Sequence, residues 1–110
     1  MELWQLTATE IIKKIKDKEI SVRESVTSAL ARSKDVNPKI NAVVSSMGSN
    51  ALLQADLLDK KIKDGDDIGI LGGVPVTVKV NIDQAGYATT NGLKIQKDLI
   101  AKHNLSLIHI

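Results

Sequence analysis

The sequence predicts an α/β fold in which amphipathic helices cover a small sheet. Three helical patterns precede residue 65, and strict alternation of apolar and polar side chains from Val76 to Ile82 is typical of a strand. One strand with a possible second is too little sheet for a complete domain. We therefore expect the 110 residues to form part of a larger domain.

The first two helices are predicted from their start signals. Thr7 to Glu10 and Ser21 to Glu24 both fit the capping box, in which a hydroxyl and a carboxylate satisfy free backbone amides reciprocally. The apolar residues that follow recur at the spacing of one buried helical face. They are Ile11, Ile12 and Ile15 after the first box, and Val22, Val26, Ala29 and Leu30 after the second.

A short link and a third helix are expected next. The second helix is predicted to stop at Asn37-Pro38, because the residue before a proline avoids the α region. Residues 40–45 are apolar and β-branched, which favours a strand or an extended link. Ser49 can cap the third helix, and Gly65 suits the left-handed position after its end. Its predicted buried stripe comprises Leu52, Ala55, Leu58 and Ile62.

Composition excludes several classes of function. The formal net charge of +2 is too small to indicate a nucleic-acid partner, and no apolar stretch approaches membrane-spanning length. The chain has no cysteine, which excludes disulfides and thiolate chemistry, and its start does not resemble a secretory signal. We expect a cytoplasmic protein without a metal or other cofactor, since His103 and His109 have no third partner of suitable spacing.

Lys79 lies in the middle of the predicted strand. Val76, Val78, Val80 and Ile82 share one face, and Thr77, Lys79 and Asn81 share the other. Alternation alone favours a half-buried strand with a solvated polar face. An enzyme could use the same row of hydroxyl, amine and amide, and periodicity does not separate the two interpretations.

Three stretches in this order resemble the N-terminal part of the amidase signature family: NPKINAVV, GGVPVTVK and TTNG. The resemblance extends from about Leu6 to Asn104. It implies the N-terminal part of the amidase signature fold, with helices packed on the first strands of a mixed sheet. The family includes bacterial amidases, indoleacetamide hydrolases and the amidase-like subunit of tRNA-dependent amidotransferases.

The resemblance also implies a catalytic role for Lys79, which matches the lysine of the family's serine, cis-serine and lysine unit. A serine hydroxyl needs a neighbouring base, and an amine serves as one only when its pKa falls from about 10.4 towards neutrality. The expected parent hydrolyses a C–N bond of a linear, small-molecule carboxamide. This chain ends before the family's glycine- and serine-rich loop, so we expect the fragment itself to be inactive.

Two features differ from the family pattern or lie outside it. The residue after the catalytic lysine is usually Asp in the family and is Val80 here, which removes a polar support without removing the base. Ser45, Ser46 and Ser49 precede the lysine and favour a loop and helix cap, while Ser106 follows it too closely to match either catalytic serine.

The last six residues, LSLIHI, are what CTG TCT CTT ATA CAC ATC encodes, and this string resembles the mosaic end of a transposase-based sequencing adapter. The family resemblance fades after Asn104. We expect residues 1–104 to be the N-terminal portion of an amidase domain and residues 105–110 to be a non-native tail. A genuine apolar C-terminus is the alternative.

Two other functions remain open. The chain could belong to the amidase-like subunit of a tRNA-dependent amidotransferase, which works with partner subunits. It could also be a non-catalytic helical module whose amphipathic helices bind a partner. The sequence does not determine the amide substrate or the oligomeric state.

Overall fold

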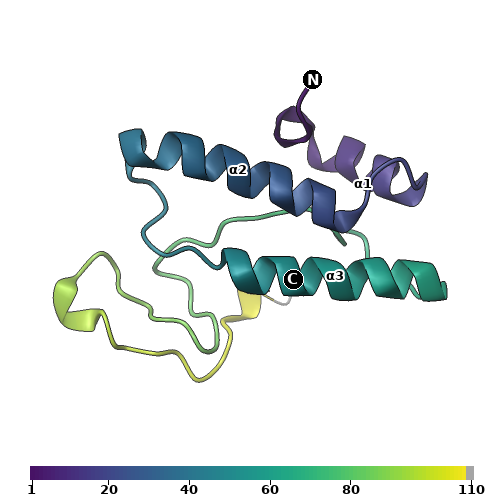
Figure 1. Ribbon diagram of the computed structural model, residues 1–110. Helices are drawn as coiled ribbons and strands as arrows, with labels where there is room; N and C mark the ends of the chain where they lie inside the picture. The colour runs from purple at the N-terminus through teal and green to yellow at the C-terminus, as the bar shows by residue number, and fades with distance from the viewer. Residues whose placement is uncertain (109–110) are drawn as a thin grey trace. The chain divides into compact units, whose positions relative to one another are not determined.

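The computed structural model describes residues 1–108 and divides into two compact units, one from Met1 to Pro75 and one from Val76 onward (Figure 1). The first unit holds the three α-helices and the second is built from turns. In chain order the elements are η1 (Leu3–Gln5), α1 (Ala8–Lys16), α2 (Val22–Ile40), α3 (Gly48–Asp64), η2 (Lys94–Gln96) and η3 (Ser106–Ile108).

Both predicted capping boxes are confirmed. The Ser21 hydroxyl accepts the Glu24 amide at 3.0 Å, and the Glu24 carboxylate accepts the Ser21 amide at 2.7 Å. Thr7 and Glu10 make the same reciprocal pair before α1. Because these bonds satisfy amides that have no intrahelical partner, they fix where α1 and α2 begin.

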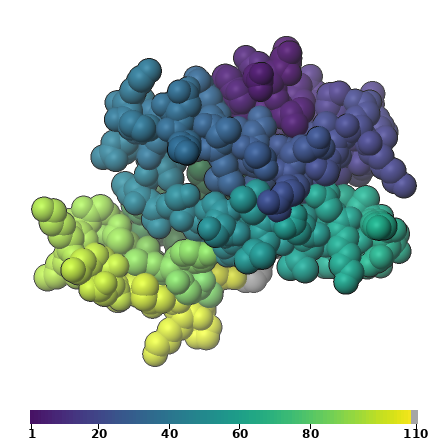
Figure 2. Space-filling view, viewed as in Figure 1, coloured from purple at the N-terminus to yellow at the C-terminus, as the bar shows by residue number. Residues whose placement is uncertain are grey.

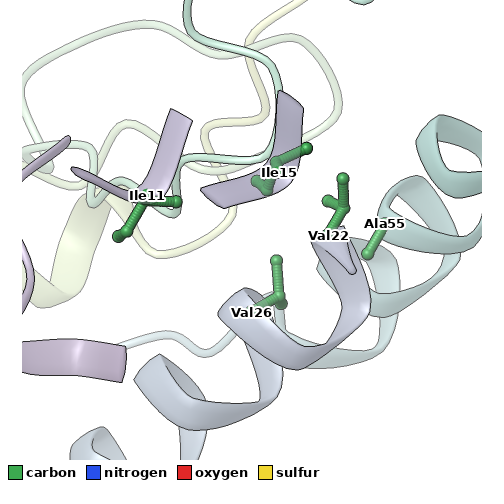
Figure 3. Packing of buried hydrophobic residues seen from close by; sticks show 5 residues of the cluster. All are labelled: Ile11, Ile15, Val22, Val26 and Ala55. Atoms are coloured by element: carbon green, nitrogen blue, oxygen red, sulfur yellow. The ribbon is translucent and has the colours of Figure 1, made fainter. Parts of the chain in front are cut away.

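The three helices of the first unit share one apolar core. α2 and α3 form an antiparallel hairpin, and their side-chain surfaces meet in Figure 2. The buried side chains come from α1, α2 and α3 and converge between the helices in Figure 3: Ile11, Ile15, Val22, Val26 and Ala55. The rest of the predicted stripes, including Leu30, Leu52, Leu58 and Ile62, packs against this cluster while partly exposed, which confirms the three predicted faces.

The predicted end of the second helix is wrong. α2 continues through Pro38 to Ile40, where Asn41 adopts a left-handed φ of 48°. A proline this close to the C-terminus costs the helix only a terminal turn's bonding, and Asn37 fixes the exit instead. Its side-chain amide donates to the Val43 carbonyl at 2.9 Å and accepts the Val43 amide at 2.8 Å.

Two further predictions around α3 have different outcomes. Ser49 does not cap the helix, which begins at Gly48 with Met47 at the cap position and no side-chain cap bond. Gly65 does follow the helix in the left-handed conformation, with φ of 83°, as predicted. Residues 41–47 form an irregular link and not a strand.

The expected sheet is not present. Within residues 1–108 there is no strand, and the sole β-type pairing is an isolated antiparallel bridge between Ala88 and Ile100. The alternation itself is seen in the exposure: Val78, Val80 and Ile82 are half-buried, and Thr77, Lys79 and Asn81 are exposed. A strand also needs a neighbouring strand to pair with its backbone, and the described residues supply none to this segment. The α/β prediction is therefore wrong for this chain taken by itself.

The two glycines of the GGVP motif are explained by close packing in the first unit. Gly73 is buried with φ of 87°, and a Cβ there would overlap Cδ1 of Ile15 and lie 3.0 Å from Cγ2 of Val22. A Cβ on Gly72 would lie 2.6 Å from the Ile68 carbonyl oxygen. The backbone of this motif thus lies directly against the core, where no side chain fits.

Replacing Gly73 with alanine is expected to destabilise the first unit more than the same change at Gly69. Both glycines have left-handed φ values, but nothing lies within 4 Å of a Cβ on Gly69. Gly69→Ala should cost only the backbone term of about 1–2 kcal/mol. Gly73→Ala should add about 1–3 kcal/mol of overpacking in urea unfolding. Equal losses for the two variants would show that Gly73 is not packed against the core as described.

The capping boxes also predict how stability responds to acid. The Ser21 amide and hydroxyl lower the pKa of Glu24 by bonding to its carboxylate, and the Thr7 amide and hydroxyl lower that of Glu10. Because both folded-state values lie below the ordinary value, the stabilisation is present above that value, about 4.3, and is lost as pH falls through the folded pKa.

A variant carrying both Glu10→Gln and Glu24→Gln keeps an acceptor oxygen at each box but cannot titrate there. Its unfolding midpoint should therefore fall less steeply than that of the parent chain as pH is lowered below about 4.3. Thermal melts at a series of pH values measure this slope. Identical pH dependence in both proteins would mean that the boxes do not stabilise the folded chain through these carboxylates.

Candidate functional site

Lys79, the candidate catalytic residue, is exposed in the second unit. Its carbonyl accepts the Ile82 amide at 3.0 Å, so a turn follows it directly. In the part of the chain that the structure describes, its amine has no hydrogen bond or ion pair. The exposure pattern of residues 77–82 places the Lys79 side chain on the solvent side, away from its half-buried apolar neighbours in sequence.

The TTNG motif forms a tight turn that contacts the residue after the lysine. The Leu93 amide donates to the Thr90 carbonyl at 2.8 Å, and the two central residues, Asn91 and Gly92, have φ values of 50° and 75°. Two consecutive positive φ values are the requirement of a type I′ turn, which Asn-Gly meets best. The Asn91 amide reaches the Val80 carbonyl at 3.5 Å, a long bond that links the turn to the lysine segment.

Asp83 links three parts of the second unit. Its half-buried carboxylate accepts the Thr89 hydroxyl at 2.5 Å, and its carbonyl accepts the Leu105 amide at 2.9 Å. Nearby, the Asn104 side chain accepts the Ala85 amide at 2.7 Å. These contacts were missed in the sequence because each joins residues distant in the chain, and only the presence of Thr89 within the TTNG motif gave a signal.

The residues on both sides of the expected boundary at Asn104 take part in these contacts. Leu105 and the turn of η3 belong to the predicted tail, whose last two residues lie outside the described part of the chain. His109 also lies there. The non-native origin of residues 105–110 therefore stays a prediction.

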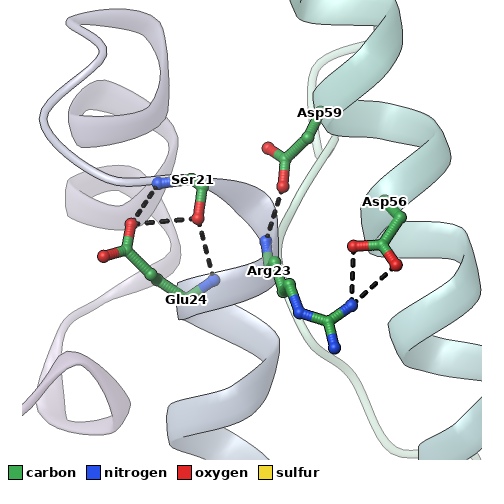
Figure 4. A network of polar contacts seen from close by, with 5 residues as sticks. All are labelled: Ser21, Arg23, Glu24, Asp56 and Asp59. Carbon is green, nitrogen blue, oxygen red and sulfur yellow. Dashed lines mark hydrogen bonds and ion pairs between the residues drawn. The ribbon is translucent and has the colours of Figure 1, made fainter.

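A polar network at the start of α2 holds the framework of the first unit (Figure 4). Asp59 of α3 accepts the Val22 amide at 2.7 Å and the Arg23 amide at 3.0 Å, which places a carboxylate at the positive end of α2. The Arg23 guanidinium pairs with Asp56, one turn earlier on α3, at 2.6 Å. The signal for Asp59 was its position as a charged residue next to the apolar stripe of α3.

The other serines and histidines considered in the sequence form no catalytic arrangement. Ser45, Ser46, Ser49, Ser106 and His103 are all exposed, and Ser46 accepts the Gly48 amide as a local loop contact. Within residues 1–108 no group of three or more His, Cys, Asp or Glu side chains could hold a metal ion. Over the same range, no helix is both long and apolar enough to cross a membrane.

Comparison with known proteins identifies relatives over nearly the whole chain. The indoleacetamide hydrolase of Bradyrhizobium diazoefficiens is 37% identical over 106 residues, which are 96% of this chain and 20% of that protein. The amidase-like (GatA) subunit of the glutamyl-tRNA(Gln) amidotransferase of Clostridium novyi is 40% identical over 108 residues, 98% of this chain and 22% of the relative. The chain therefore spans about a fifth of the length of these relatives.

A solved structure agrees with these sequence relatives. The crystal structure of a bacterial aryl acylamidase of the amidase signature family matches 91% of this chain and 21% of its own, with a TM-score of 0.85 and 31% identity. The model of the family described as Amidase matches residues 24–109, a range that contains Lys79, the GGVP glycines and the TTNG turn. The chain belongs to the amidase family and corresponds to an N-terminal part of its relatives.

Proposed function

We propose that this chain is the N-terminal part of an amidase that hydrolyses the C–N bond of a small linear carboxamide. The observation that carries the proposal is the family match over residues 24–109, which includes the segment from GGVP to Lys79. The relatives are about five times longer than this chain, which leaves room for the nucleophile, the bridging serine and most of the substrate pocket. The enzyme would work in the cytoplasm without a cofactor.

In the proposed reaction Lys79 is the base. A serine hydroxyl supplied by the remainder of the domain would give its proton, through a second serine with a cis peptide bond, to the neutral amine of Lys79. The hydroxyl oxygen would form a bond to the amide carbonyl carbon, and the C–N bond would break as the amine leaves with a proton. Water would then release the acyl group. An amine acts as a base only when burial or nearby donors favour its neutral form, so we propose that the remainder of the domain covers this side chain.

The departure at Val80 is consistent with this role. Val80 is half-buried and Lys79 is exposed, so a residue at position 80 does not share the lysine's surroundings in the described chain. What Val80 contributes to the site is its carbonyl, which accepts the amide of Asn91, and any residue provides that group.

The test uses a full-length amidase that carries this N-terminal sequence. Lys79→Met should lower kcat/KM for carboxamide hydrolysis by about a hundredfold to ten-thousandfold, the usual contribution of a general base. Lys102→Met, a change of another exposed lysine in the same unit, is the matched control and should retain activity. Full activity in the Lys79 variant would remove the lysine from the mechanism. Amide hydrolysis by the 110-residue chain alone would contradict the expectation that its nucleophile is supplied from elsewhere.

A second candidate function has specific support. The corresponding glutamyl-tRNA(Gln) amidotransferase subunits of Clostridium novyi and Carboxydothermus hydrogenoformans are 40% and 41% identical to this chain, slightly above the indoleacetamide hydrolase. The proposed Lys79 chemistry is the same for both functions, but the acceptor of the acyl or amino group differs. Release of a free acid from a small amide without other subunits favours the hydrolase. Activity that needs glutamine, misacylated tRNA and partner subunits favours the amidotransferase.

A further inference from the structure

Asn91-Gly92, at the tip of the TTNG turn, has a chemistry that the proposed amidase function does not use. The chain contains six asparagines, and the residues that follow them are Pro38, Ala42, Ala51, Ile82, Gly92 and Leu105. Asn91 is therefore the one asparagine whose following amide carries no side chain on its Cα. Attack of that amide on the asparagine side chain is hindered by a following Cβ, and glycine has none.

The turn leaves both reacting residues accessible. Asn91 and Gly92 are exposed, and each has a left-handed φ. The Gly92 amide, which would be the nucleophile, donates only to the Thr90 hydroxyl, at 3.3 Å. The Asn91 side-chain nitrogen, which would be the leaving group, donates to the Gln96 side chain at 3.0 Å. Both bonds are to partly exposed side chains, where water competes with them, and neither belongs to an α-helix or a strand.

We propose that Asn91 is a site of spontaneous deamidation in the folded chain. Hydroxide removes the Gly92 amide proton, and the nitrogen attacks Cγ of Asn91 to close a succinimide ring. The side-chain nitrogen leaves as ammonia after taking a proton from water, which regenerates the hydroxide. Water then opens either C–N bond of the imide, giving aspartate or isoaspartate. No oxidant, metal or enzyme enters the balance.

The product alters the turn next to the lysine segment. Either form adds one negative charge, which lowers the formal net charge of +2 by one. Isoaspartate also inserts a methylene group into the backbone between the Asn91 amide, which bonds to the Val80 carbonyl, and Gly92. The inserted carbon is incompatible with the turn that closes from Thr90 to Leu93. The modification would thus loosen the link between the turn and the residue after Lys79.

The test incubates the purified 110-residue chain at mildly alkaline pH, in native buffer and in urea, and then digests it with trypsin. Cleavage after Lys79 and Lys94 gives one peptide, 80–94, that contains both Asn81 and Asn91. Fragmentation in the mass spectrometer should place a mass gain of about one dalton on Asn91 and not on Asn81, with early- and late-eluting forms for the two products.

Asn41 is the matched control for conformation. It is exposed with a φ of 48°, like Asn91, but Ala42 follows it. Faster conversion at Asn91 than at Asn41 in native buffer supports the proposal. Equal rates at the two sites would overturn it, because the following glycine would then have no effect. Conversion of Asn91 in urea with none in native buffer would also overturn it, because the folded turn would then protect the site. Neither outcome depends on whether the chain belongs to a hydrolase or an amidotransferase.

Discussion

The first unit depends on how the N-terminus of α2 is satisfied. A helix start exposes amides that have no partner within the helix, and here the first three are taken by the Asp59 carboxylate and the Ser21 hydroxyl. Asp59 comes from α3, so the bond that completes α2 also fixes how the two helices cross. Val22, whose amide it holds, is 1% exposed and lies at the centre of the core. A polar contact and the burial of one side chain therefore specify the same point in the fold.

The GGVP motif extends this point towards the candidate site. Gly73 contacts Val22 and Ile15 through bare backbone, so the chain passes the core at a defined place before it reaches Pro75, the end of the first unit. Four residues later comes Lys79. The helices thus matter to the proposed chemistry without supplying a reacting group, since they fix the start of the segment that carries the base. In the second unit the Thr89–Asp83 bond and the Asn-Gly turn serve the same purpose for the segment that follows it.

Local patterns in the sequence predicted the parts of this arrangement that depend on near neighbours. The capping boxes at Thr7 and Ser21 and the apolar faces of the helices are set by residues three or four apart, and they were found correctly. Asp59 and Gly73 act on residues far away in the chain, so spacing could not reveal their partners. The predicted strand failed for a related reason, because alternation specifies two faces but pairing needs a second strand. Lys79 was singled out through family resemblance, since its exposure pattern equally fits a solvated surface.

The dependence of the first unit on Asp59 is tested most directly by comparing Asp59→Ala with Asp56→Ala in urea unfolding of the chain. Both remove a carboxylate from α3 that contacts Arg23, but only Asp59 satisfies the amides of α2. Asp59→Ala should lower the free energy of unfolding by about 1–3 kcal/mol, the cost of leaving backbone donors unpaired. Asp56→Ala breaks a half-exposed ion pair and should cost less than about 1 kcal/mol. Equal, small losses for the two variants would contradict this dependence, because α2 would then begin correctly without the carboxylate from α3.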